Sequence, residues 1–239
     1  GPAVLLLCLR NPVHVAQSVA TLDHLSGGRF IFGVGVGGEH PTEFMASGVP
    51  VNERGPRTNE ALEVLRRLWT EPAVAFAGKY YRFDEIAVLP APVQQPHPPV
   101  WVGGRSEAAL TRTAKYGQVW APAFVTPEKL QEGKERLATL CRAEGREPQT
   151  VQSAVYFFAN VATSRDQAWA EAGEFLSKNY NIPAKSFARL AVYGTPEECI
   201  AHTRRYLDAG AEHVIIRFAS FQPLQQLERW TTDVMPALR

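Results

Sequence analysis

The stretch AVLLLCLRNP, at residues 3–12, joins a buried strand to the start of a helix. The continuous apolar run of residues 3–9 is typical of a parallel strand that is covered on both faces. Asn11 followed by Pro12 is a typical helix start, because asparagine caps free N–H groups and proline fits the first helical position. The stretch therefore predicts a βα unit.

The same strand-then-helix pattern recurs along the chain. Helical patterns follow most of the strands, and Ser164 and Thr195 each open a helix with a capping box. Residues 37–57 are predicted as an irregular loop, and residues 74–99 as a hairpin-like insertion. Strands that alternate with helices imply a parallel sheet. The predicted strands cover residues 3–9, 29–36, 100–102, 118–121, 152–161 and 212–218.

The six predicted βα units allow two closures of the sheet. They suit an open, doubly wound sheet as they stand. Two further units before Gly1 would instead complete a (β/α)8 barrel of ordinary length. Because the chain opens directly into a strand, we expect residues to precede Gly1.

Composition excludes several classes of protein. Apolar residues make up 45% and charged residues 21%, as in an ordinary globular chain. The net charge of +1 gives no basic footprint for nucleic acid, and residues 3–9 fall far short of the roughly 20 apolar residues that span a bilayer. The three cysteines are scattered and form no CxxC pair, so we expect reduced thiols, no metal site and a cytoplasmic location.

Residues 33–38, GVGVGG, match the G-x-G-x-x-G fingerprint of dinucleotide-binding enzymes. That fingerprint needs a helix to begin at once, whereas Pro41 and Pro50 interrupt the residues that follow. An open-sheet NAD enzyme is therefore disfavoured. We expect instead that Gly35 and Gly37 let the end of a strand approach a flat ligand closely.

Two further stretches are candidate site residues. Gly103, Gly104, Arg105 and Ser106 lie between a strand and a helix, where converging N–H groups can bind an anion; the alternative is a plain tight turn with a capping serine. His40, beside Glu39, follows the glycine-rich strand and is a candidate residue of a substrate cleft. Arg54, Arg57 and Glu60 are interpreted as ion pairs at a helix start rather than an anion site.

Several motifs together resemble those of the luciferase-like monooxygenases, the bacterial luciferase-like oxidoreductases that depend on a flavin or on the deazaflavin coenzyme F-420. They occur in that family's order along the chain. The motifs are LRNP at 9–12, LDHLSGGRF at 22–30, GVGVG at 33–37, GVP at 48–50, LRRLWTE at 65–71, PPVWVGG at 98–104 and GTPEE at 194–198.

The resemblance implies the fold. It implies an α/β protein with a (β/α)8 TIM barrel of the bacterial luciferase-like type, of which this chain holds six of the eight βα units. The chain would form a single domain over residues 1–239, with the hairpin-like insertion at about 74–99. Residues 3–9 would be the third strand. The first two strands, and a histidine that often assists the chemistry, would precede Gly1, so we expect the catalytic residues to lie before Gly1.

The resemblance also implies a site and an activity. Ala3 and Val4 would be joined by a cis peptide bond that presses on the cofactor ring, and Gly103 to Ser106 would hold its phosphate. The cofactor would be coenzyme F-420 or FMN, and residues 39–44, EHPTEF, look more like the branch that uses F-420. The protein would transfer a hydride or activate oxygen on a small organic substrate. The alternative is a flavin-binding barrel without turnover. We expect no nucleic-acid or membrane partner, and a homodimer is allowed.

Overall fold

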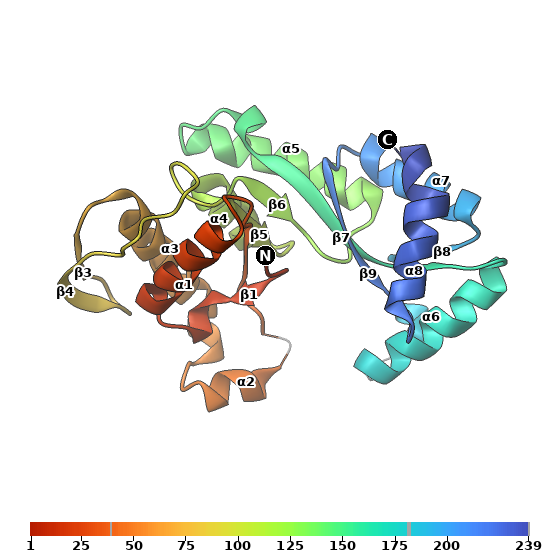
Figure 1. Cartoon of the computed structure of the whole chain (residues 1–239), viewed down its shortest axis with the longest axis horizontal. Helices are drawn as coiled ribbons and strands as arrows, with labels where there is room; N and C mark the ends of the chain where they lie inside the picture. Colours follow the sequence, from red (N-terminus) through yellow and green to blue (C-terminus); the bar gives the residue numbers. More distant parts are fainter. Residues whose placement is uncertain (39, 181–182, 239) are drawn as a thin grey trace. The chain divides into compact units, whose positions relative to one another are not determined.

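The computed structural model describes residues 1–38, 40–180 and 183–238 (Figure 1). The chain divides into two compact units, one formed by Gly1–Trp120 with Leu137–Val151 and the other by Ala121–Arg136 with Gln152–Arg239. Each unit is an arrangement of parallel strands and helices. The single domain over residues 1–239 stays a prediction.

The first unit is built on parallel strands in the order β1-β2-β5-β6. In the register, Leu5 lies opposite Val34, and Val34 lies opposite Val102. The elements are β1 (Leu5–Leu6), α1 (Pro12–Leu25), β2 (Phe32–Gly35), α2 (Pro41–Ala46), α3 (Arg54–Thr70), β3 (Val74–Ala77), β4 (Arg82–Ile86), β5 (Val100–Gly103), α4 (Glu107–Tyr116) and β6 (Val119–Ala121), which ends at the boundary with the second unit.

Helices α1 and α3 lie side by side and share one core with the strands (Figure 1). Phe32 of β2 meets the edge of the Trp69 ring of α3, with the ring centroids 5.7 Å apart. The Trp69 indole N–H donates to the Ala16 carbonyl of α1 at 3.2 Å. This bond satisfies the one polar atom of a large buried side chain, so the tryptophan fixes both helices against β2.

A two-stranded antiparallel hairpin, β3 with β4, interrupts the first unit as the sequence predicts. The Glu60 carboxylate of α3 accepts from the backbone N–H groups of Lys79, Tyr80 and Tyr81. These charge-assisted bonds hold the hairpin turn on α3.

The second unit is built around β7 (Gln152–Val161), which pairs in parallel with both β8 (Ala191–Gly194) and β9 (His213–Phe218). Phe157 of β7 stacks on Tyr206 at 5.4 Å, so that face of β7 packs on α7. The helices are α6 (Arg165–Tyr180), α7 (Pro196–Asp208) and α8 (Pro223–Arg229); α5 (Pro127–Ala143) contributes residues to both units.

Polar side chains close the carboxyl end of β7. Asn160 donates to Glu171 at 3.0 Å and to the Ala219 carbonyl at 2.9 Å. The Gln226 side chain accepts from the Val161 backbone N–H at 2.7 Å. Because Asn160 and Gln226 are buried, these bonds supply the partners that their polar groups lose from water.

Most sequence expectations for the elements are confirmed. Asn11 caps α1 by accepting from the Val13 N–H at 2.9 Å, and the predicted strand at residues 152–161 is found. Thr195 and Glu198 form the predicted capping box of α7.

Three expectations about elements were wrong. Residues 3–9 form only the short β1 and then a 3-10 turn at Leu7–Leu9, because a continuous apolar run reports burial and not conformation. The predicted loop at 37–57 contains α2, which begins at Pro41, and the first turn of α3. Strand β8 was missed, because its four residues lie directly before the helix signal at Thr195. Among the described residues, no helix is both long and apolar enough to cross a membrane.

His202 on α7 gives a prediction for stability against pH. Its ring stacks on Tyr206 at 5.8 Å, and burial, followed by Arg205 and Arg165, lowers its pKa from 6.5. The fold therefore holds a neutral imidazole that the unfolded chain protonates. The stability that depends on this group is fully present above pH 6.5 and declines as the pH falls toward the lower, folded-state pKa.

We expect His202→Gln to reduce the loss of unfolding free energy between about pH 7.5 and about pH 5.5, measured by urea denaturation. His14→Gln, on the exposed side of α1, is the matched control. An unchanged pH dependence in His202→Gln would contradict this reading of α7.

Candidate functional site

Val4 lies against glycines at the ends of two neighbouring strands, Gly35 of β2 and Gly103 of β5. A Cβ on Gly35 would overlap the Val4 Cγ2 atom, and a Cβ on Gly103 would lie 3.1 Å from its Cγ1 atom. Val4 is 38% exposed, so the isopropyl group also faces outward. The Ala3–Val4 peptide bond is cis, as expected. The structure thus brings together three of the predicted site residues: Val4, Gly35 and Gly103.

Alternation along β2 explains why glycine occupies this face. Residues on a strand point in turn to opposite sides, so Phe32 and Val34 belong to the core under α1 and α3. Gly33 and Gly35 then face the other side, where the chain before β1 approaches them. The sequence FGVG therefore places bulk on one face and room on the other.

The turn after β5 has the geometry of an anion site. Gly104 has φ 110°, a backbone conformation that favours glycine. Ser106 is the N-cap of α4, and its hydroxyl oxygen accepts from the Ala109 N–H at 3.3 Å. Gly104, Arg105 and Ser106 are exposed, so the first N–H groups of α4 and its positive dipole end are accessible. Glu107 in the first turn is also exposed and competes for the same dipole end.

Trp120 supports this turn from β6, and sequence reasoning missed it. Its buried indole N–H donates to the Gly104 carbonyl at 2.8 Å. The bond fixes the orientation of the peptide that precedes Arg105. Residues 104 and 120 are too far apart in the sequence for a local motif to connect them. The contact arises because β5 and β6 are neighbours in the sheet.

Arginines of α3 and α4 lie near the loop that follows β2. A Cβ on Gly38 would lie 3.0 Å from the Arg54 Nε atom, which is buried without a hydrogen-bond partner among the described residues. Arg112 of α4 is 4% exposed and donates to Asn59 at 2.7 Å. Arg57 forms an ion pair at the helix start, as expected, but its partner is Glu53 at 2.8 Å. Glu60 instead accepts from backbone N–H groups of the hairpin. Arg112 gave no signal in the sequence.

Cys8 is a neutral thiol in this region. Burial raises its pKa, and this effect outweighs the nearby positive charges of Arg112 and Arg54. The thiol lies 3.6 Å from the Val36 carbonyl oxygen. A protonated, buried thiol is a poor nucleophile, so the structure gives Cys8 a packing role.

The remaining candidates lie apart from this set. Gly37 lies against Leu6 of β1. A Cβ on Gly37 would lie 2.8 Å from the Leu6 Cδ1 atom, so only glycine allows this close approach. His40 is exposed directly before α2; its backbone carbonyl accepts from the Glu43 N–H at 3.1 Å, and its side chain does not cap the helix. Glu39 lies outside the described residues. Within the described ranges, no group of three or more His, Cys, Asp or Glu side chains could hold a metal ion.

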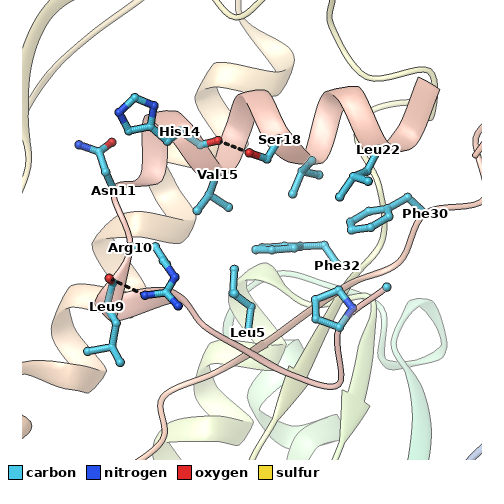
Figure 2. Close-up of a pocket in the computed structure, with 13 residues that line it drawn as sticks. Leu5, Leu9, Arg10, Asn11, His14, Val15, Ser18, Leu22, Phe30 and Phe32 are labelled. Carbon is cyan, nitrogen blue, oxygen red and sulfur yellow. Dashed lines mark hydrogen bonds between the residues drawn. The ribbon is translucent and has the colours of Figure 1, made fainter. Parts of the chain in front are cut away.

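A separate apolar groove lies between α1 and the first strands, with a volume of about 680 Å³ (Figure 2). Val15 and Leu22 of α1 face Phe30 and Phe32 across it. Its lining includes none of Val4, Gly35 and Gly103. At its rim, the Ser18 hydroxyl donates to the His14 carbonyl within α1. The groove therefore adds no catalytic groups to the candidate site.

Residues 1–185 match the model of the luciferase-like monooxygenase family. The chain belongs to this family. The match covers the glycine platform formed by Val4, Gly35 and Gly103, and also the turn that opens α4. The family resemblance read from the sequence motifs is confirmed.

Solved structures give the same fold. An F-420-dependent secondary alcohol dehydrogenase in complex with an F-420–acetone adduct has a TM-score of 0.84 at 22% identity, over 96% of this chain and 76% of its own. The monooxygenase RslO1 from Streptomyces bottropensis has a TM-score of 0.84 at 23% identity, over 99% and 77%. Riboflavin lyase with modified FMN and riboflavin has a TM-score of 0.78 at 18% identity, over 100% and 69%.

These similarities show an α/β fold with a parallel sheet that matches luciferase-like TIM-barrel structures over most of their length. The chain spans about three quarters of the first two relatives. Fold alone does not determine a reaction; the reaction of this luciferase-like protein depends on the residues at its site.

The contact of Val4 with Gly35 gives a prediction for stability. We expect Gly35→Ala to lower the unfolding free energy by about 1–3 kcal/mol, because the added methyl group overlaps the valine. Val4→Ala should largely restore the stability of the Gly35→Ala chain, since it removes the overlapping atom. Urea denaturation of the single and double variants measures this coupling.

Gly55→Ala is the control, because its new Cβ would lie 3.6 Å from Arg112, an ordinary contact. Additive effects of Gly35→Ala and Val4→Ala would show that the two residues do not pack as described.

Proposed function

We propose that this luciferase-like protein is an oxidoreductase that uses a reduced flavin or deazaflavin to transfer a hydride or activate oxygen on a small organic substrate. The observation that carries the proposal is the glycine platform of Val4, Gly35 and Gly103. Gly103 ends β5, directly before the turn that opens α4, so the platform and the turn are neighbours. Membership of the family supports the same conclusion. The catalytic acid or base is left unassigned.

The α4 turn fits the phosphate of such a cofactor. Its exposed N–H groups and the Ser106 hydroxyl would donate to phosphate oxygens, and the helix dipole would favour the negative charge. Gly103 and Gly104 keep this approach free of side chains, and Arg105 adds a positive charge at the rim. Trp120 holds the turn in place through the Gly104 carbonyl.

The platform fits a flat ring. Val4 presents an apolar, partly exposed surface, and Gly35 and Gly103 let it lie close to the sheet. Gly37, two residues after the end of β2, lets the backbone lie close against Leu6 of β1. When bound, the isoalloxazine-type ring supplies the redox chemistry, while these residues orient it and exclude water from one face.

We favour coenzyme F-420 over FMN as the cofactor. Residues 39–44, EHPTEF, resemble the branch of the family that uses F-420, and the dehydrogenase named above contains an F-420 adduct. Titration of the purified chain with reduced F-420, FMN and NADPH tests this choice. We expect saturable binding of F-420 and none of NADPH. Tight NADPH binding would contradict the proposal, and cofactor binding without oxidation of any substrate would favour a non-catalytic flavin-binding protein.

Gly104→Asp tests the phosphate site. We expect cofactor affinity to fall by an order of magnitude or more, because the new side chain fills the turn and adds a negative charge. Isothermal titration calorimetry with the cofactor that binds in the first experiment measures the effect.

Gly145→Asp is the matched control, since Gly145 also has a positive φ, 70°, and a Cβ there would meet no atom within 4 Å. Equal affinities of the Gly104→Asp and Gly145→Asp chains, both folded by circular dichroism, would move the phosphate site elsewhere.

A further inference from the structure

Arg217, near the carboxyl end of β9, stands among aromatic rings of the second unit. Its guanidinium carbon lies 5.9 Å from the centre of the Phe158 ring, 5.8 Å from Phe175 and 5.7 Å from Tyr180. One of its N–H groups donates to the Tyr180 hydroxyl at 2.9 Å. Phe158 is its neighbour in the parallel register of β7 with β9.

The positive charge of Arg217 has no carboxylate partner among the residues that the structure describes. The two glutamates of the adjacent helix α6 are already engaged: Glu174 pairs with Lys178 at 2.6 Å, and Glu171 bonds to Asn160 and Ser220. Arg217 is nevertheless exposed. Its remaining N–H groups are therefore available to an anion from outside.

The rings around Arg217 form one aromatic cluster that also includes Tyr156. Phe124 stacks on Phe158 at 5.0 Å and meets Tyr156 edge-on at 5.5 Å. Phe187 meets Phe158 edge-on at 5.7 Å. Phe158 and Phe187 are buried at the base of the cluster. The partly exposed rings of Tyr156, Phe175 and Tyr180 give a flat apolar skeleton favourable contact surfaces. Burial raises the pKa of Tyr156 and of Tyr180, so both hydroxyls keep their protons near neutral pH and can donate.

The position of the cluster suits a ligand. Arg217 is the last residue but one of β9, and ligands of parallel α/β proteins bind at the carboxyl ends of their strands. A guanidinium binds a carboxylate through two parallel hydrogen bonds, which gives orientation as well as charge pairing. Aromatic side chains beside it would select an organic acid over a small inorganic anion.

We propose that Arg217, with the Tyr180 and Tyr156 hydroxyls, binds the carboxylate of a substrate whose skeleton is flat or aromatic. The proposal deepens the proposed function, on which it rests, by naming the substrate class of the oxidoreductase. Arg217 is then a specificity-determining residue: it holds the acid group of the substrate, and the cluster holds the ring.

Benzoate and benzamide are the probes, because they share a ring and differ in charge. Calorimetric titration of the full 239-residue chain, with and without bound cofactor, should give at least tenfold tighter binding of benzoate. Arg217→Gln should weaken benzoate binding at least tenfold and leave benzamide unchanged. Arg217→Lys should recover part of the loss, since it keeps the charge but not the paired donors. Tyr180→Phe should weaken benzoate binding severalfold.

Arg165→Gln is the matched control. Arg165 is also exposed and lies over a ring, that of Tyr193 at 4.3 Å, but it is paired with Glu198 at 3.5 Å. This variant should bind benzoate as the unchanged protein does.

Three results would overturn the proposal: equal affinity of the unchanged protein for the two probes, unchanged benzoate binding in the folded Arg217 variants, or inorganic phosphate binding that is tighter than benzoate binding and is lost in Arg217→Gln. Should Arg217→Gln fail to fold by circular dichroism, the comparison of the two probes on the unchanged protein and the Tyr180→Phe titration decide. The cofactor titration tests the proposed function separately. If the chain bound neither F-420 nor FMN but still preferred benzoate to benzamide, only the proposed function would be contradicted.

Discussion

Contact between the Val4 side chain and the glycines at positions 35 and 103 constrains how β1, β2 and β5 approach one another. The strands carry their bulk on the opposite face, where Phe32 packs against Trp69 of α3. On the other face, glycines at positions 33 and 35 carry no side chain, so the chain of residues 2–4 packs directly on the backbone of β2. The two faces of β2 are thus both close-packed, one by helices and one by the chain before β1, and Val4 is the partly exposed side chain that results.

The sequence predicted this platform in part. Strand–helix alternation, the Asn11 and Thr195 caps and the family motifs located the strands and the glycines, because each depends on residues close together in the chain. The bond from Trp120 to Gly104 and the burial of Arg112 were missed, because they join elements that only the fold brings together. Strand β8 was missed because a four-residue strand carries too little periodicity beside a strong helix signal.

Charge is handled differently in the two units. In the first unit, Arg112 is buried and donates to the Asn59 side chain and the Gly55 carbonyl, a costly arrangement that fixes α4 to α3. In the second, Arg217 is exposed and its charge faces aromatic rings. Removing the buried arginine would therefore be felt in stability, whereas the exposed arginine contributes its charge at little folding cost.

The bond from the Trp120 indole to the Gly104 carbonyl also has an optical consequence. Trp120 is one of five tryptophans, and its buried ring is fixed to the turn that opens α4. Indole emission overlaps the absorption of flavin-type rings, so an excited Trp120 would transfer its energy to a ring bound nearby. If the proposed cofactor binds on the platform, part of the tryptophan emission would be quenched on binding, and the protein would report its own occupancy without any added label.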